Sequence, residues 1–125
     1  MAKILIGDDS WLIRQMLTKY LTKAGYEVVA AENGAGVLDL YPKEKPDCII
    51  LDLLMPDIGG LDVLKKLKTM NLKTPVLILT ADIQSTTRQR CIDEGVFDFL
   101  IKPPNEENIL YKVKVAIESN RDSIP

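Results

Sequence analysis

The sequence contains no histidine. Histidine is the commonest general base near neutral pH and the usual carrier of a phosphoryl group, so this chain cannot supply either function from that side chain. Cysteine is scarce. Cys48 and Cys91 stand in apolar or helical segments without a CxxC spacing, which argues against a redox or zinc site and indicates reduced packing residues of a cytosolic protein. Any chemistry must therefore use carboxylates, lysine and threonine.

The chain also lacks a basic excess and a long hydrophobic run. Lys and Arg total 16 against 18 Asp and Glu, and no basic stripe is present that could neutralise phosphates, so we expect no direct binding to nucleic acid. The N-terminal MAKILIGDDS has too short an apolar run for a signal peptide or a membrane span. With 46% hydrophobic residues, the composition is that of a cytoplasmic globular protein with no membrane partner.

Apolar runs and helical patterns alternate along the chain. The patterns predict strands over residues 2–6, 26–31, 48–52, 75–80 and 96–101, and helices from Ser10 to Gly25, from 34 to Pro42, and over 61–70, 84–94 and 105–119. The helix over 84–94 has few apolar residues, so we expect it to be the least firmly docked. Residues 1–120 form one predicted domain, and residues 121–125 are a predicted polar tail. Five such units predict a parallel sheet covered by helices on both faces.

Polar side chains follow the ends of four predicted strands. Asp8 and Asp9 follow the first strand, Asp52 ends the third, Thr80 ends the fourth and Lys102 follows the fifth. In such sheets ligands bind outside the carboxyl ends of the strands, so all five side chains could share one pocket. Three close carboxylates repel one another unless a cation compensates, and an oxygen-rich site suits Mg²⁺ or Mn²⁺.

Beside a metal, a carboxylate oxygen can attack a phosphoryl group and form an aspartyl phosphate. Any one of these acids alone is better explained as a helix cap or a turn residue, and Lys102 alone could be a surface lysine. Their conjunction on one edge of the sheet favours a site for metal and phosphate. Lys102 and Thr80 would bind the phosphoryl oxygens.

Four segments, GDDS, ILDLLMPDIGG, LILTAD and FLIKPP, resemble the receiver domains of two-component response regulators. The resemblance covers residues 2 to about 119, and the order and spacing of the four motifs make it specific. It implies a flavodoxin-like doubly wound (βα)5 fold with the strand order 2-1-3-4-5. It also implies that the Lys102–Pro103 peptide bond is cis.

The resemblance implies a set of ligands for the metal and the phosphoryl group. Asp52 would accept the phosphoryl group from the phosphohistidine of a histidine kinase or a phosphotransfer protein. Asp9, Asp52 and the backbone carbonyl of Leu54 would bind Mg²⁺ directly, whereas Asp8 would act through a water molecule. Lys102 would pair with the phosphoryl group.

The resemblance also implies a switch. Thr80 would swing toward the phosphoryl group, and Phe99 would be the aromatic residue that changes rotamer after it. The outcome would be altered binding of a target protein on the face formed by the fourth helix, the fifth strand and the last helix. Because the four motifs are followed by no predicted effector domain, we expect a stand-alone receiver, as in chemotaxis or a phosphorelay.

Three further residues are expected to modulate the site. Leu54, Ala81 and Asp82 flank the place where a hydrolytic water must approach in receivers. We expect the bulky Leu54 side chain to impede that water, and Asp82 to contact a partner or a phosphatase.

Other classes of protein share parts of this pattern. A flavodoxin-like cofactor carrier needs phosphate-binding donors in its first loop, where GDDSW would repel an anion. A magnesium-dependent phosphatase that works through an aspartyl phosphate needs the same nucleophile, but such enzymes usually carry a second acid where Leu54 stands. A phosphorylation-independent scaffold is the third alternative. Apart from its own phosphorylation and dephosphorylation, we expect no enzymatic activity.

Overall fold

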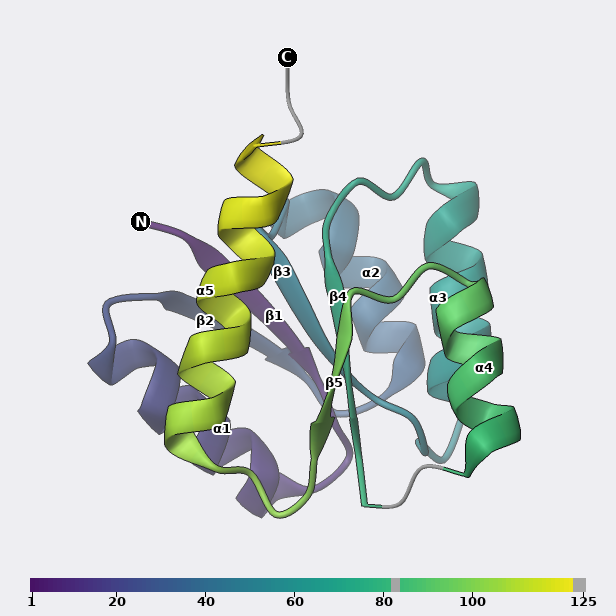
Figure 1. Ribbon diagram of the computed structural model, residues 1–125, viewed down its shortest axis with the longest axis horizontal. Helices are drawn as coiled ribbons and strands as arrows, with labels where there is room; N and C mark the ends of the chain where they lie inside the picture. Colours follow the sequence, from purple (N-terminus) through teal and green to yellow (C-terminus); the bar gives the residue numbers. More distant parts are fainter. Residues whose placement is uncertain (82–83, 123–125) are drawn as a thin grey trace.

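The computed structural model describes residues 1–81 and 84–122, and within them strands and helices alternate from β1 to α5 (Figure 1). The elements are β1 (Lys3–Gly7), α1 (Trp11–Lys23), β2 (Glu27–Ala31), α2 (Gly34–Glu44), β3 (Cys48–Asp52), α3 (Gly60–Thr69), β4 (Val76–Thr80), α4 (Ser85–Asp93), β5 (Asp98–Ile101) and α5 (Glu106–Asp122). Among the described residues, no helix is long and apolar enough to cross a bilayer.

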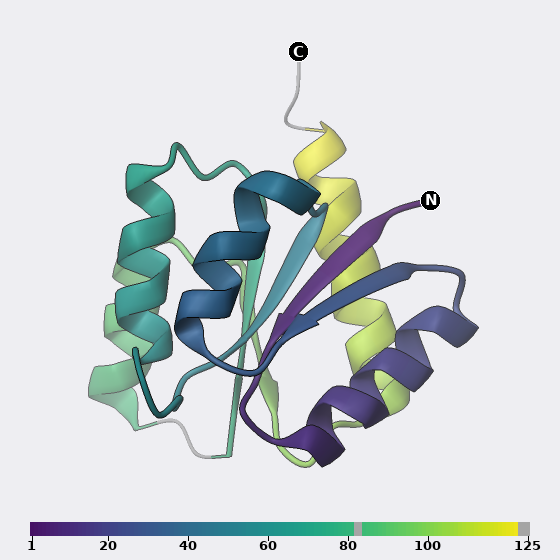
Figure 2. The same cartoon turned by 180° about the vertical axis from the view of Figure 1, so that it is seen from behind.

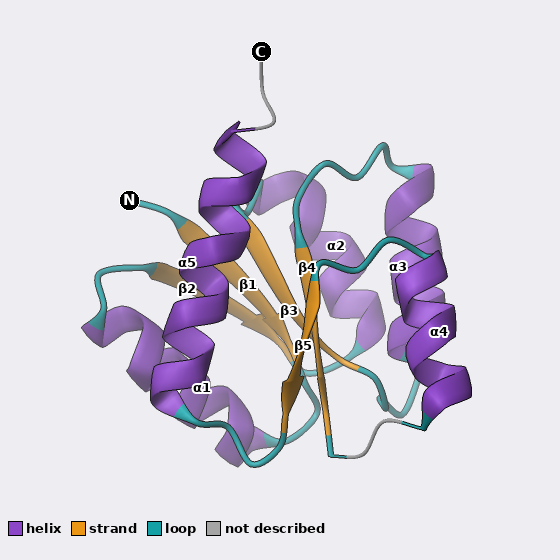
Figure 3. Cartoon of the chain, in the orientation of Figure 1, coloured by secondary structure: helices purple, strands orange, loops and turns teal. Residues whose placement is uncertain are grey.

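The five strands form one parallel sheet in the order β2-β1-β3-β4-β5, which confirms the fold class and the predicted strand order. Helices α1 and α5 cover one face, and α2, α3 and α4 cover the other (Figures 1 and 2). All strands run in the same direction, so their carboxyl ends meet at the lower edge of the sheet as drawn in Figure 3. This edge carries the polar residues that follow the strands.

The two central strands hold the core together. Every residue of β3 and of β4 is buried, because both faces of the sheet are covered and neither strand lies at an edge. Their side chains alternate between the two hydrophobic clusters: Ile50 packs on the α1–α5 side, whereas Ile49 and Leu51 pack on the α2–α4 side. Such burial stabilises the fold by roughly 1.5–3 kcal/mol per large aliphatic side chain.

Local signals fix several helix ends. The Ser10 hydroxyl accepts a hydrogen bond from Ile13 N at 3.2 Å and so caps α1. Gly25 follows the end of α1 with a φ of 96°, in the left-handed region that glycine occupies at little cost. Asn105 caps α5 as predicted, since its Oδ1 accepts from Asn108 N at 2.9 Å.

Some predicted boundaries were wrong. Helix α2 does not stop at Pro42 but continues to Glu44 and ends at Lys45, whose φ of 49° is left-handed. Proline disfavours a helix at the residue before it, but here Tyr41 packs against the core and holds the last turn in place. Strand β5 begins at Asp98 rather than at residue 96. Helix α5 extends to Asp122, into the segment 121–125 that the sequence predicts as a tail.

The two neighbouring helices α3 and α4 dock to very different extents. Helix α3 buries Gly60, Val63, Leu64 and Leu67, whereas Cys91 is the buried residue among the side chains described for α4. The sparse apolar pattern that the sequence shows over 84–94 thus corresponds to a helix with little buried surface.

Candidate functional site

The structure brings the predicted polar residues together at the carboxyl edge of the sheet. Asp52 and Thr80 are the last residues of β3 and β4, and each is only 4% exposed. Together with Asp9, Lys102 and the neighbouring residues of two loops, they line a pocket of about 340 Å³. Asp8 lies beside them and is fully buried.

Three carboxylates form the negative part of this site. Each of Asp8, Asp9 and Asp52 offers an oxygen, and these three oxygens lie within 4.8 Å of one another. Asp8 Oδ1 accepts a hydrogen bond from Ser10 N at 2.8 Å, which orients the carboxylate at the start of α1. Asp9 is exposed, so the cluster is open to solvent on one side.

Lys102 is the cation that faces these acids. Its Nζ lies 3.2 Å from Asp8 Oδ2 and 3.4 Å from Asp52 Oδ1, so one ammonium group serves two carboxylates. The contact with Asp8 is an ion pair without hydrogen-bond alignment, and Asp8 Oδ2 has no hydrogen-bond partner among the described residues although it is buried. A buried oxygen of this kind costs free energy unless a further positive group reaches it.

The donor set therefore fits a hard divalent cation. It offers carboxylate oxygens, one of them buried without a hydrogen-bond partner in the described part of the chain, and an open side where water ligands can complete the coordination. Asp8, Asp9 and Asp52 would hold such an ion. These features support Mg²⁺, and Mn²⁺ has the same preference for oxygen.

Asp52 titrates far from its ordinary range. Burial at the end of β3 disfavours the charged carboxylate, and the neighbouring Asp8 adds repulsion, so the pKa of Asp52 is raised to about 6. Lys102 and the backbone N–H of Leu54, which lies 3.3 Å from Asp52 Oδ1, oppose this rise only in part. A bound cation would return the carboxylate to its ionised form.

Thr80 and Lys102 are held side by side by the sheet. Lys102 N donates to Thr80 O at 2.8 Å, which extends the pairing of β4 with β5 by one bond beyond the end of β5. The Lys102–Pro103 peptide bond is cis, as the resemblance implied. Both side chains line the pocket that contains Asp52.

The predicted switch residue Phe99 lies inward on β5, with only 6% of its surface exposed. The guanidinium carbon of Arg88 in α4 lies 4.8 Å from the centre of its ring, a cation–π contact that the sequence did not reveal. Lys112 Nζ in α5 donates to Phe99 O at 2.6 Å. Phe99 is therefore connected to both α4 and α5.

The residues predicted to modulate the site are placed as far as the structure describes them. Leu54 and Ala81 both line the pocket, and Leu54 is 77% exposed. Asp82 lies outside the described residues.

Sequence reasoning missed Asp57, in the connection between β3 and α3. Its carboxylate accepts hydrogen bonds from Gly34 N and Ala35 N, both at 2.9 Å, at the start of α2. These bonds hold the pKa of Asp57 below its usual value. One signal was available: α2 begins with Gly-Ala-Gly and has no acid in its own first turn.

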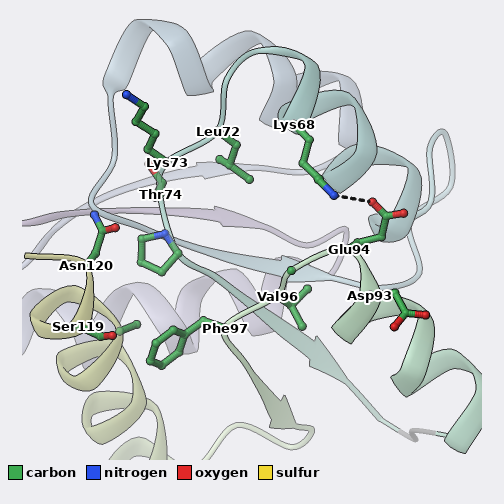
Figure 4. A pocket seen from close by; sticks show the side chains of 13 residues that line it. Lys68, Leu72, Lys73, Thr74, Asp93, Glu94, Val96, Phe97, Ser119 and Asn120 are labelled. Atoms are coloured by element: carbon green, nitrogen blue, oxygen red, sulfur yellow. Dashed lines mark hydrogen bonds and ion pairs between the residues drawn. The ribbon is translucent and has the colours of Figure 1, made fainter. Parts of the chain in front are cut away.

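A second, larger hollow of about 540 Å³ lies at the opposite edge of the sheet, where β4 and β5 begin (Figure 4). Phe97 and Val96 form part of its wall, and Lys68 pairs with Glu94 across 3.2 Å at its side. The two charges of this pair neutralise each other. The carboxyl edge differs in that one lysine faces several acids.

A five-stranded parallel sheet with this order, covered by helices on both faces, defines a flavodoxin-like α/β domain, and its carboxyl edge carries the acidic pocket. The profile of the response regulator receiver domain matches residues 4–114. The chain therefore belongs to that family: it is the receiver domain of a two-component response regulator.

Two kinds of relative accompany this match. The response regulator MprA of Mycolicibacterium vanbaalenii is 34% identical over 92% of this chain and 50% of its own length. The transcriptional regulatory protein KdpE of Mycobacterium tuberculosis is 36% identical over 96% of this chain and 53% of its own. Among solved structures, the chemotaxis protein CheY4 of Vibrio cholerae is 36% identical, with a TM-score of 0.89, over 93% of this chain and 98% of that one.

The curated relatives are longer than this chain. The chain spans about half the length of the curated relatives it matches. The role in transcription that the name of KdpE states therefore belongs to the whole regulator.

Proposed function

We propose that this receiver is a phosphorylation switch in which Asp52 accepts a phosphoryl group and Thr80, Lys102 and Phe99 report it to a partner protein. The observation that carries the proposal is the carboxyl-edge cluster, in which a buried, lysine-paired Asp52 lies within 4.8 Å of two further acids. The donor is a histidine kinase or a phosphotransfer protein, because the chain has no histidine of its own.

In the transfer step an oxygen of the Asp52 carboxylate attacks phosphorus. An O–P bond forms, the P–N bond to the donor's imidazole breaks, and the bonding electron pair stays on that nitrogen, which takes up a proton. A bound divalent cation supplies positive charge that offsets the repulsion among the acids and the incoming phosphoryl oxygens. The carboxylate must be ionised to attack, and a bound cation would favour that ionised form.

Lys102 and Thr80 respond to the product. Phosphorylation adds a charge of about −1.5 to −2 and new acceptor oxygens. Lys102 is already within 3.4 Å of Asp52 and can donate to these oxygens, while the Thr80 hydroxyl reaches them when the loop after β4 moves inward. The movement changes the environment of Phe99, which pairs with Ile78 of β4 and lies under Arg88 of α4. The target face is α4, β5 and α5.

The central test is an intact-mass measurement after incubation with acetyl phosphate and Mg²⁺. We expect the parent protein to gain one phosphoryl group and the Asp52→Asn variant to gain none. No Asp52-dependent gain in mass would overturn the proposal. Sustained turnover of small phosphate esters would favour the phosphatase alternative instead.

The reporting step has its own test. Thr80→Ala should leave Asp52 phosphorylatable and weaken the dependence of target binding on phosphorylation. If target binding stayed fully dependent on phosphorylation, Thr80 would not be the reporting residue.

The exposed Leu54 side chain supports a slow loss of phosphate, because it stands at the mouth of the pocket where a hydrolytic water must enter. Leu54→Asn should shorten the lifetime of the phosphorylated form. An unchanged lifetime would remove this role of Leu54.

A further inference from the structure

Asp57 ties two separate parts of the molecule together. Its two carboxylate oxygens accept from Gly34 N and Ala35 N, which lie 23 and 22 residues earlier in the chain. The first N–H groups of a helix have no partners within the helix, so both bonds satisfy donors that would otherwise be open. The next N–H group of the helix, that of Gly36, is satisfied by a neighbouring residue, because it donates to Asn33 Oδ1 at 2.8 Å.

The contact between α2 and the β3–α3 connection is close. A side chain at Gly34 would place its Cβ 3.0 Å from the Cβ and from the carbonyl oxygen of Ile58, and 2.8 Å from Val63. The absence of a Cβ at Gly34 thus allows the connection to approach the first turn of α2. At this separation the short Asp57 side chain reaches both backbone donors.

The same connection carries the backbone that faces the acidic pocket. It is closed at its base by the bond from Gly60 N to Leu53 O at 2.8 Å, and Leu53 N donates to Leu79 O of β4 at 3.2 Å. Leu54 lies inside this closed loop, and its exposed side chain adds little packing. Leu53, Met55 and Ile58 of this segment are partly buried against the α2–α4 side of the core. Asp57 adds the pair of hydrogen bonds that fixes the segment to the first turn of α2.

We propose that Asp57 is a positioning residue for the metal site: by fastening the β3–α3 connection to the start of α2, it holds the Leu54 backbone beside Asp52. This inference rests on the proposed function, since it assigns Asp57 a part in preparing the same site. The bonds from Gly34 and Ala35 stabilise the charged carboxylate, so the fastening persists at neutral pH.

A matched pair of variants tests this role. Asp57→Ala removes the two hydrogen bonds between the start of α2 and the β3–α3 connection. Asn33→Ala removes a capping hydrogen bond from the same helix but leaves those two in place. The readout is the dissociation constant for Mn²⁺, measured from the electron paramagnetic resonance signal of the free ion. Partners that orient metal ligands typically contribute about 10–100-fold to affinity, so Asp57→Ala should weaken Mn²⁺ binding about tenfold. Asn33→Ala should change it less than about twofold.

A purely structural role predicts a different result. Both variants would then lower the thermal unfolding midpoint, and both would bind Mn²⁺ as the parent does, which would overturn the positioning role. Asp57→Asn, which keeps an acceptor oxygen and the side-chain shape, serves in place of Asp57→Ala if the latter does not fold, and it should weaken Mn²⁺ binding by a smaller factor. Mn²⁺ binding unchanged in that variant would overturn the role as well.

The proposed function is tested separately on the parent. If the parent shows an Asp52-dependent gain in mass and Asp57→Ala binds Mn²⁺ normally, the positioning role fails alone. A parent that gains no mass and binds no Mn²⁺ overturns both.

Discussion

Asp52 is the last residue of β3 and Asp57 lies in the connection that follows it, yet their carboxylates meet opposite environments. Asp52 is buried at the end of a central strand beside a second acid, and its pKa is raised to about 6. Asp57 is exposed and receives two backbone N–H groups from the start of α2, and its pKa is lowered. Desolvation and like charge act on the first carboxylate, and hydrogen bonds act on the second.

The difference fits the two proposed roles, Asp52 as the phosphoryl acceptor and Asp57 as a positioning residue. Without a cation, the ionised form of Asp52 destabilises the folded state, and a bound metal ion can relieve that cost. The ionised form of Asp57 stabilises the folded state and needs no ligand. Burial at the strand end thus makes the charge of Asp52 unfavourable, while backbone hydrogen bonds in the neighbouring loop make the charge of Asp57 favourable.

The largest expected effect is on stability when Asp52 becomes neutral. Because the folded pKa of about 6 exceeds the ordinary value of 3.8, the folded state binds more protons than the unfolded state between these values, and stability falls as the pH rises through that window. Asp52→Asn should therefore raise the free energy of unfolding of the metal-free protein by roughly 2–3 kcal/mol at pH 7.5. Urea unfolding of the parent and the variant, with a chelator present, measures this difference in the free energy of unfolding.

The control for this change is the same pair of proteins at pH 4. There Asp52 is largely protonated in the folded state, so most of the difference between parent and Asp52→Asn should disappear. A variant that is less stable than the parent at pH 7.5 would contradict the unfavourable charge assigned to Asp52.

The two acids also show how far sequence reasoning reaches. The site acids and Thr80 were predictable because apolar runs typical of buried strands end in, or are followed by, polar residues, and parallel strands bring those ends to one edge. Asp57 was missed, since its partners are 22 and 23 residues away and the contact depends on how closely α2 approaches the loop. Arg88 over Phe99 was missed for the same reason.

The helix ends also include some that the sequence predicts and one that it does not. Ser10 and Asn105 cap their helices through bonds to residues three positions later, a pattern that is visible in the sequence. The continuation of α2 past Pro42 depends on the packing of Tyr41 against the core, which no local pattern records. For the helix ends, therefore, contacts close in the chain were predicted, whereas an end that depends on tertiary packing was not.

Binding of a divalent cation should offset the destabilising charge of Asp52 and so remove the contrast with the stabilising charge of Asp57. At ten times its dissociation constant, Mg²⁺ bound only to the folded state stabilises a protein by about 1.4 kcal/mol. We expect this gain for the parent at pH 7.5, a smaller gain at pH 5 where Asp52 binds a proton, and a smaller gain for Asp52→Asn at either pH. Thermal unfolding with and without Mg²⁺, at matched ionic strength, measures it. Equal gains in parent and Asp52→Asn would show that the ion binds elsewhere.

The smallest expected effect is that of replacing Asp57. This change should lower the free energy of unfolding, whereas replacing Asp52 should raise it. The folded pKa of Asp57 is lowered, so its contribution to stability is present above its ordinary pKa of 3.8 and is lost as the pH falls through the folded value. Asp57→Asn, made in the Asp52→Asn background to remove the competing titration, should therefore lower the unfolding free energy at pH 7.5 and have progressively less effect below pH 3.8. The loss should be smaller than the gain at Asp52, because the carboxylate is exposed and screened, and it should shrink further in 1 M salt. A loss that stayed constant from pH 7.5 to pH 2 would mean that Asp57 acts through shape alone, and that the contrast between the two carboxylates is not electrostatic.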